Sequence, residues 1–352
     1  MAVVAFHLSM AFADPRYGGQ GIGERYTSQG RLGVDFFFVL SGFIILQAHR
    51  ADFGNAARLP LYLWRRFARV YPIYWIYRSA MCVRLVLGLG QVAKAPEDGI
   101  SWLTDFSLIR FSTHTPPLKV AWTLFHEVAF YAVFSLLLVN RRLGIVAMAL
   151  WATACIVNTA LGSPAAAQPW GTYVSAYNLE FFFGMCAYAF SLRKLNAWLV
   201  SGTGFVLVAA GQWLIGQTGI SEQIIFGAAF SLIIAGAASA ERHGRLKLPQ
   251  LFVAIGDSSY SLYLIHLPVI GLLLKLVGYA NLGAVVPPAL LWWSVFAVTV
   301  GIGYGAWILI ESPMQRALRP PREGEGGRSW LRFLDRSRAP ASRRSVRPPV
   351  RR

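Results

Sequence analysis

Residues 120–139 read VAWTLFHEVAFYAVFSLLLV, and His126 and Glu127 are the only acidic or basic side chains among them. Twenty residues of α-helix rise about 30 Å, which is close to the thickness of the hydrocarbon core of a bilayer. The run is therefore predicted to cross a membrane as a helix that carries one carboxylic acid away from water.

Comparable apolar runs recur along the whole chain. Of its 352 residues, 55% are hydrophobic and 14% are charged, whereas about a quarter of a soluble globular chain is charged. This composition excludes the soluble enzyme folds. We predict an all-α, polytopic membrane protein over residues 1–319 with about ten transmembrane helices, placed at 2–13, 33–48, 70–92, 120–139, 143–162, 171–192, 197–216, 221–240, 251–276 and 285–311.

The basic residues divide unevenly between the segments that join these runs. Alternate segments and the C-terminal tail hold 24 of the 33 lysines and arginines, and the remaining connecting segments hold 6. Because cytoplasmic segments carry the excess of Lys and Arg, both termini are predicted to be cytoplasmic. The net charge of +17 then reflects topology rather than a nucleic-acid partner, and the Arg-, Pro-, Gly- and Ser-rich segment 320–352 is expected to be a disordered basic tail.

Ionisable side chains inside membrane spans are costly and are candidate functional groups. Arg31 and Asp35 lie four residues apart and would share one helix face, so their spacing is compatible with a structural ion pair as much as with a catalytic role. This criterion selects eight candidates within the predicted spans: His7, Asp35, Arg78, Arg84, Glu127, Glu180, Asp257 and His266.

Glu127 and Tyr131 also lie four residues apart and are predicted to face the same way. The pair His126-Glu127 would open a zinc-protease helix only if a second histidine stood at position 130, where this chain has Phe130. No metal site is therefore predicted. The sequence also lacks the Gly-x-Ser-x-Gly elbow and the Gly-Lys phosphate-binding loop, which removes the common serine-hydrolase and NTPase interpretations.

Arg65, Arg66 and Arg69 stand just before Tyr71 and Pro72, at the cytoplasmic end of the third predicted span. Guanidinium groups at this spacing suit a phosphate. An anchor that extends to lipid headgroups is equally consistent with the spacing.

A first apolar segment with His7 is followed by five runs in a fixed order: GRLGVDFFFVLSGFIIL (30–46), RRFARVYPIYW (65–75), WTLFHEVAFY (122–131), GDSSYSLYLIHLP (256–268) and IESP (310–313). Together these runs resemble the integral membrane acyltransferase-3 family over nearly the whole membrane part of the chain. The resemblance implies ten spans in a bacterial inner membrane, and transfer of an acyl group, mostly acetyl from acetyl-CoA, onto hydroxyls of extracytoplasmic glycans. It implies no permanently bound cofactor; the acyl-CoA is a donor substrate, and the oligomeric state stays open.

The resemblance also implies roles for individual residues. His7 matches the essential histidine of the family's first span, Arg66 and Arg69 match its arginine pair, and Glu127 matches its carboxylate after a tryptophan. The late run with Tyr260, Tyr263 and His266 is matched too, and its role is taken as structural. The family has an arginine eleven positions before its histidine, which here falls ahead of Met1, so we expect either a truncated first span or a site without that partner.

The expected mechanism is acyl transfer across the membrane. The phosphates of CoA would bind Arg65, Arg66 and Arg69 at the cytoplasmic side, and His7 would serve as general base or would carry the acyl group itself. Arg31, Asp35, Tyr260 and His266 are second choices for the site. A glycan or lipid-linked sugar transporter is the main alternative, because intramembrane charges also line transport paths, and a non-catalytic scaffold for polysaccharide assembly is a third.

Overall fold

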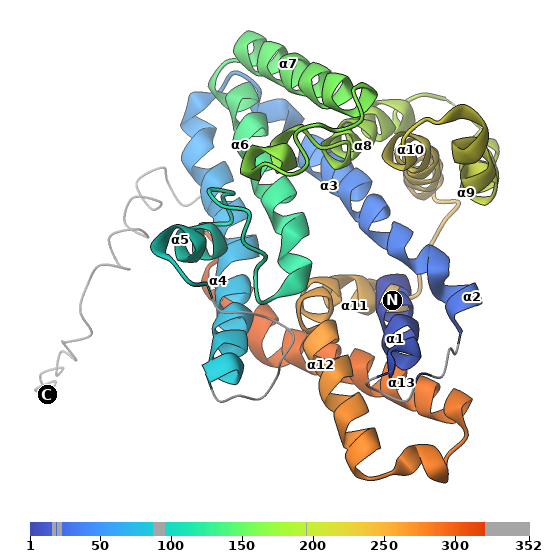
Figure 1. The fold of residues 1–352 in the computed structure, drawn as a ribbon. Helices are drawn as coiled ribbons and strands as arrows, with labels where there is room; N and C mark the ends of the chain where they lie inside the picture. The colour runs from blue at the N-terminus through green and yellow to red at the C-terminus, as the bar shows by residue number, and fades with distance from the viewer. Residues whose placement is uncertain (16–18, 20–22, 87–95, 195, 321–352) are drawn as a thin grey trace, which may run out of the picture.

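A computed structural model describes residues 1–15, 19, 23–86, 96–194 and 196–320, and this part of the chain contains helices and turns without strands (Figure 1). The longer helices are α1 (Ala2–Ala13), α3 (Gly33–His49), α4 (Leu59–Val86), α6 (Trp122–Val139), α7 (Arg141–Ala160), α8 (Tyr177–Ser191), α9 (Ala197–Thr218), α10 (Glu222–Arg242), α12 (Ser259–Tyr279) and α13 (Pro288–Ala306). The short helices are α2 (Glu24–Thr27), α5 (Gly99–Ser107), α11 (Gln250–Asp257) and α14 (Ser312–Ala317). The all-α prediction is confirmed.

Seven helical segments of the described chain are long and apolar enough to cross a membrane: Glu24–Asp52, Lys119–Val139, Arg141–Ala160, Ala197–Thr218, Glu222–Arg242, Ser259–Tyr279 and Pro288–Ala317. Helices also occupy the other three predicted positions. α1 has 12 residues and α8 has 15, while α4 has 28 residues but carries several arginines. The count of ten stays a prediction, and the predicted tail from 321 onward lies outside the described residues.

The boundaries of two predicted spans differ in the structure. The third span was predicted at residues 70–92. Instead α4 begins at Leu59 with Pro60 in its first turn, where a missing N–H is harmless, and it tolerates Pro72 inside. The run 251–276 divides at Ser258 into α11 and α12. As a consequence, Arg65, Arg66 and Arg69 lie on a helix.

The packing order of the helices follows α9, α10, α8 and α3, with α6 and α7 beside α8 and with α12 and α13 as a further layer (Figure 1). Gly42 of α3 and Gly184 of α8 lie directly against backbone atoms of the opposite helix, so a side chain larger than hydrogen would collide there. Close approach through small residues is the usual way in which helices associate in lipid, where a hydrophobic driving force is lacking.

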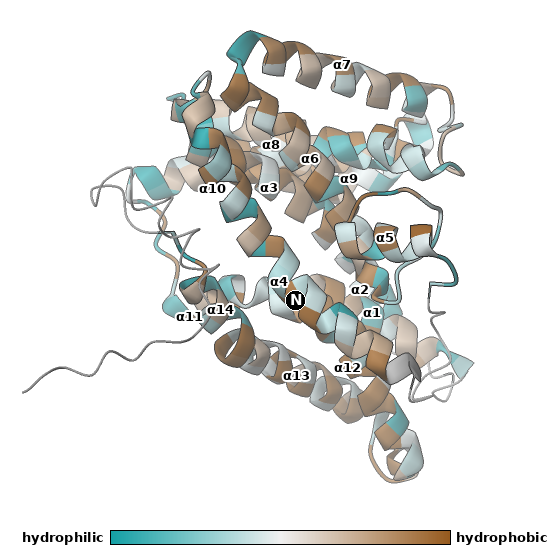
Figure 2. Ribbon diagram, turned by 90° about the vertical axis from the view of Figure 1, so that its left-hand side faces the viewer, coloured by the Kyte–Doolittle hydropathy of each residue, from teal (hydrophilic) through white to brown (hydrophobic). Residues whose placement is uncertain are grey.

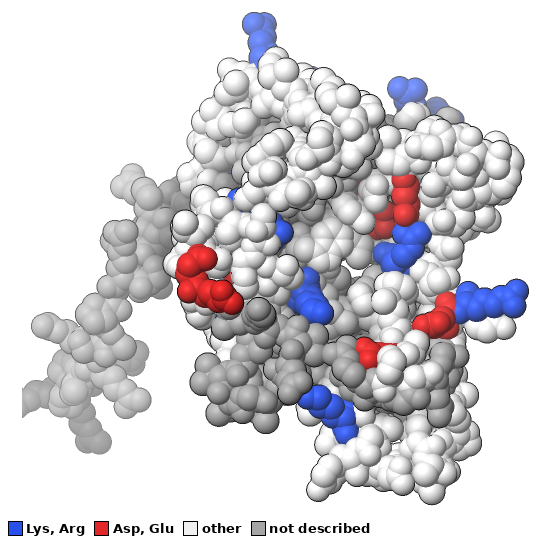
Figure 3. Space-filling model, in the orientation of Figure 1, with Lys and Arg blue, Asp and Glu red and all other residues white. Residues whose placement is uncertain are grey.

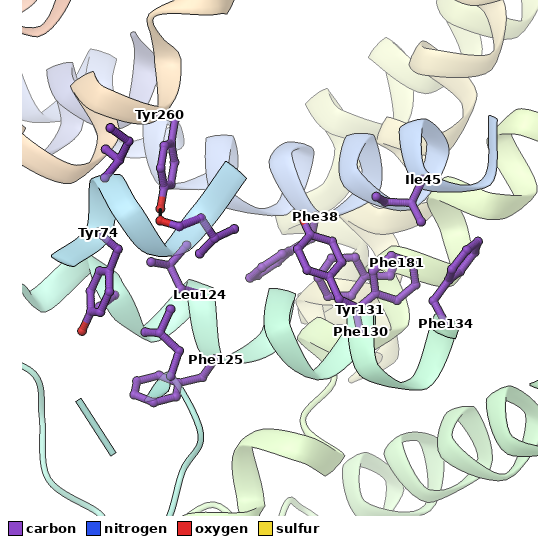
Figure 4. Close-up of a cluster of buried hydrophobic side chains, with 14 of the residues drawn as sticks. Phe38, Ile45, Tyr74, Leu124, Phe125, Phe130, Tyr131, Phe134, Phe181 and Tyr260 are labelled. Atoms are coloured by element: carbon purple, nitrogen blue, oxygen red, sulfur yellow. Dashed lines mark hydrogen bonds between the residues drawn. The ribbon is translucent and has the colours of Figure 1, made fainter. Parts of the chain in front are cut away.

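An aromatic cluster joins α3, α6 and α8 in the centre of the molecule (Figure 4). The rings of Phe130 and Phe181 stack with centroids 4.3 Å apart, and Phe38 packs 5.0 Å from Phe181. By contrast α7, α9 and α13 expose large apolar side chains, as helices that face lipid do, and α13 is largely brown in Figure 2. The rigid centre therefore holds α6, and with it Glu127, in place.

Candidate active site

Two histidines from opposite ends of the chain meet where α1 crosses α12. Nδ1 of His7 lies 3.0 Å from Nε2 of His266, and Nδ1 of His266 lies 2.7 Å from the backbone oxygen of Tyr263. His266 is fully buried, while His7 keeps part of its surface exposed. The indole N–H of Trp292 donates to the hydroxyl of Ser9 at 3.0 Å and ties α1 to α13. The predicted base and a second-choice residue thus form one pair.

Tyr260, Tyr263 and His266 follow one another every third residue and share one face of α12. The Tyr263 hydroxyl lies 2.9 Å from Thr123 Oγ1 and donates to the backbone oxygen of Val120 at 3.0 Å. The Tyr260 hydroxyl points from α12 toward α4 and donates to the backbone oxygen of Val70 at 2.8 Å (Figure 4). This face of α12 is therefore held against both α6 and α4.

A largely apolar cavity of about 620 Å³ opens along the same face of α12. Tyr260, Tyr263 and His266 line it from one side, and the start of α3 and residues 1–4, at the N-terminal end of α1, complete the lining. Its wall follows α12 from His266 to Tyr260, and the ring of Tyr260 also lies against Arg69 of α4, whose guanidinium carbon is 5.2 Å from the ring centroid.

Arg69 is engaged by a buried carboxylate. Its Nη1 donates to Glu311 Oε1 at 3.0 Å, and the other oxygen of Glu311 accepts from the backbone N–H and the hydroxyl of Ser261 at 3.0 and 2.6 Å. The amide of Gln315 adds a bond of 2.8 Å to Oε1. Glu311 ends a π-helical turn, Trp307–Glu311, a feature that is frequent at functional sites.

Arg66 lies on the adjoining face of α4, above the rings of Tyr131 and Tyr62 at 5.6 and 6.0 Å. The hydroxyl of Tyr131 donates to the buried carboxyl group of Glu127, as the four-residue spacing predicts. Within the described chain no ion pair joins Arg66 to an acid, and Arg65 is exposed. The charges of Arg66 and Arg69 both act on the Glu127 carboxyl group, whereas Arg65 lies apart from this cluster.

An ion pair between Arg31 and Asp35, one of the two interpretations that their spacing allowed, is not formed. Arg31 instead pairs with Glu222 at the start of α10, because the 3-10 turn Ser28–Leu32 precedes α3 and directs Arg31 away from the Asp35 face. Asp35 is buried on α3 and interacts with the side chain of Glu180 on α8. Neither Arg31 nor Asp35 contacts the histidine pair.

Residue patterns alone did not single out two buried interactions. Glu311 lies in the run IESP, but nothing in that run reveals that Arg69, 242 residues earlier, is its partner. The second is the ion pair between Arg78 and Asp105, 2.8 Å apart and fully buried, with the rings of Trp102 and Phe106 4.6 and 4.4 Å from the guanidinium carbon. Burial raises the pKa of the Asp105 carboxyl, although Arg78 opposes this. This pair fixes α5 to α4.

Charged side chains are sparse on the face shown in Figure 3, and they lie singly or in small groups. This distribution is that of a chain whose surface is mostly surrounded by lipid, and the buried polar clusters described above stand out against it.

Comparison with known proteins gives one family and several relatives. A family model described as an acyltransferase domain, the acyltransferase-3 type, matches residues 1–309. The exopolysaccharide production protein ExoZ of Rhizobium meliloti (strain 1021) is 30% identical over 325 residues, which cover 86% of this chain and 95% of the relative. The acyltransferase MdmB of Streptomyces mycarofaciens is 26% identical over 362 aligned positions, 90% of this chain and 89% of the relative. No solved structure matches.

Proposed function

Because this chain belongs to the acyltransferase-3 family and is a multi-pass membrane acyltransferase, we propose that it moves an acyl group, acetyl in the first instance, from acyl-CoA to a hydroxyl of an extracytoplasmic glycan. The observation that carries the proposal is the contact between His7 and His266 beside an apolar cavity. The protein would act in a bacterial inner membrane with both termini in the cytoplasm.

His7 is the general base of the proposed reaction. A neutral imidazole takes the proton of the acceptor hydroxyl as that oxygen attacks the thioester carbonyl carbon. The new C–O ester bond forms, the C–S bond breaks, and the CoA sulfur leaves with the proton that the imidazole had taken. His7 suits this role because it is half-buried: it can reach a substrate, and it is oriented by a buried neighbour.

The donor would lie along α12. Six residues separate Tyr260, which contacts Arg69, from His266, which contacts His7; at 1.5 Å per residue this is about 9 Å of helix. A thioester arm in the apolar cavity would then reach His7 while the CoA phosphates meet Arg66. Arg69 already has Glu311 as its partner, so we assign the phosphates chiefly to Arg66, with Arg65 at the exposed edge.

The chemical class of the acceptor is inferred from the name of a relative. The printed name of ExoZ assigns that protein to exopolysaccharide production, and 95% of its length aligns with this chain. A surface polysaccharide is therefore the glycan that we propose for this protein.

The test measures acetate on the surface glycan of a strain that lacks the gene and of strains that express variants. Loss of glycan-bound acetate with an unchanged amount of glycan is expected for the deletion, because a transporter or a scaffold would change the amount instead. His7→Ala should fall to less than about a tenth of the wild-type acetylation. His243→Ala is the matched control, since His243 is exposed at the end of α10, away from α12. Full acetylation by a membrane-inserted His7→Ala protein would remove the general-base role.

A further inference from the structure

We propose that His266 is a positioning residue that fixes the tautomer of His7 and so presents the Nε2 lone pair of His7 to the substrate. The inference rests on the proposed function of His7 as a base. It assigns a task to a residue that the sequence pattern alone leaves as a structural histidine.

Nδ1 of His266 is a hydrogen-bond donor. This nitrogen lies 2.7 Å from the backbone oxygen of Tyr263 and 3.3 Å from that of Leu262. A carbonyl oxygen can only accept, so Nδ1 of His266 must carry the hydrogen. Of the two nitrogens of a neutral imidazole only one carries a hydrogen, and Nε2 of His266 is therefore an acceptor.

The neutral state of His266 follows from its surroundings. The side chain is fully buried, and its contacts in the described structure are two carbonyl oxygens, the rings of Tyr263 and His7, and the apolar wall of the cavity. No carboxylate lies among them. A buried imidazolium without a counterion is costly, so the acceptor form of Nε2 is the stable one.

His7 is the donor in the hydrogen bond between the two histidines. Its Nδ1 lies 3.0 Å from the acceptor Nε2 of His266, so Nδ1 of His7 must donate. The remaining nitrogen of His7, Nε2, then holds the lone pair, and the base is ready before the substrate arrives. When Nε2 takes the hydroxyl proton, Nδ1–H goes on donating to His266 and stabilises the imidazolium that forms. In the serine-protease triad a carboxylate accepts the corresponding hydrogen bond from the catalytic histidine. In this protein the acceptor is a neutral, buried histidine.

His266 is held in its orientation by contacts between two helices. The backbone oxygen that fixes His266 belongs to Tyr263, whose own hydroxyl bonds to Thr123 and Val120 near the start of α6. The orientation of His266 is therefore set by the packing of α12 on α6. His266 acts on the reaction through His7.

Two substitutions separate positioning from packing. His266→Gln places an amide oxygen near the former Nε2 and can still accept from His7, whereas His266→Leu fills the space without an acceptor. Positioning predicts that His266→Leu lowers kcat for acetyl transfer in membranes about a hundredfold, with the KM for acetyl-CoA unchanged, and that His266→Gln restores at least a tenth of wild-type kcat. His126→Leu is the matched control, because His126 is equally buried but bonds to Asn178.

Equal kcat values for folded His266→Leu and wild type would overturn the proposal, and so would equal losses in the Leu and Gln variants. If His266→Leu does not reach the membrane, the Gln variant and a spectroscopic measurement decide. In protein labelled with ¹⁵N-histidine, the signal that disappears in His7→Ala belongs to His7. It is expected to report hydrogen on Nδ1 in the wild type and to show a weaker preference in a variant without an acceptor at 266, where the backbone oxygen of Val3 is the remaining acceptor near the ring.

A His7 signal with hydrogen on Nε2 in the wild-type protein would contradict the inference directly. This measurement needs no activity, and it therefore separates the two proposals. If His7→Ala stays active while the Nδ1–H tautomer is present, the proposed base is wrong and the hydrogen-bond chain stands. If His7→Ala is inactive and the tautomer is Nε2–H, the base stands and the role of His266 fails.

Discussion

Arg66 and Arg69 belong to the same short sequence motif, but the structure gives their side chains different partners. Arg69 has a buried carboxylate partner in Glu311, while Arg66 lies on two tyrosine rings with its Nε buried and without a hydrogen-bond partner. A buried donor without a partner is costly, so Arg66 is the guanidinium that gains most from an incoming phosphate.

Arg66→Ala is expected to raise the KM for acetyl-CoA at least tenfold with a smaller effect on kcat, because phosphate contacts are made in both the ground state and the transition state. Steady-state kinetics in membrane vesicles check this. Arg142→Ala, at an exposed position in the first turn of α7, is the control and should change the KM little. An unchanged KM in Arg66→Ala would assign the phosphates elsewhere.

Arg69→Ala is expected to reduce the amount of folded protein instead, because it leaves Glu311 buried without its cation. Removing one partner of a fully buried pair costs several kcal/mol; with Arg69 two-fifths exposed we expect about 1–2 kcal/mol. Thermal stability of detergent-solubilised protein is the measurement. Glu311→Gln in the same chain should recover part of the loss, and a double variant no more stable than Arg69→Ala would argue against the charge pair as the cause.

The short helix α5, which lies between two predicted spans, is fixed to α4 by hydrogen bonds. Three aromatic side chains of α4 donate to the backbone oxygens at the end of α5: Tyr71 to Ser107 at 2.7 Å, Tyr74 to Asp105 at 2.7 Å and Trp75 to Phe106 at 2.9 Å. These bonds satisfy carbonyls that every helix end leaves free. The start of α5 depends on one capping residue, Asp98.

Asp98→Ala is expected to loosen α5, because the Asp98 carboxylate accepts from the backbone N–H of Ser101 at 2.7 Å and caps the helix. That hydrogen bond holds the pKa of Asp98 below its usual range. A lowered pKa means that the cap is present above about pH 4, the usual value for an aspartate, and is lost as the pH falls through the lower value of the folded state. The protection factors of the amides of residues 99–107, that is, their exchange relative to the intrinsic rate at each pH, should be low in the variant at neutral pH and change little on acidification, whereas in the wild type they should fall only in acid.

At the scale of the whole molecule, the basic residues predict which ends of the helices face the cytoplasm, and the helix order agrees with alternating spans. Asn55 is exposed between α3 and α4, and Ala167 is exposed between α7 and α8. The distribution of lysine and arginine predicts that these two segments lie on opposite sides of the membrane.

In a variant without Cys82, Cys155 and Cys186, a cysteine at Asn55 is expected to resist a membrane-impermeant thiol reagent in intact cells, and one at Ala167 to react. Both should react after the cells are permeabilised, which is the control for exposure. Labelling of the Asn55 position in intact cells would reverse the predicted topology.

The sequence by itself determined the all-helical class, the positions of the apolar helices and the family, because hydrophobic length and motif order are local properties that a chain shows without folding. It also placed Tyr131 beside Glu127, since a spacing of four residues is fixed by the helix itself. Only the tertiary structure decided that His7 meets His266, that Glu311 engages Arg69 and that Arg31 pairs with Glu222 rather than Asp35. Those partners lie 259, 242 and 191 residues apart, and a contact at such separation depends on how whole helices cross, which no local pattern records.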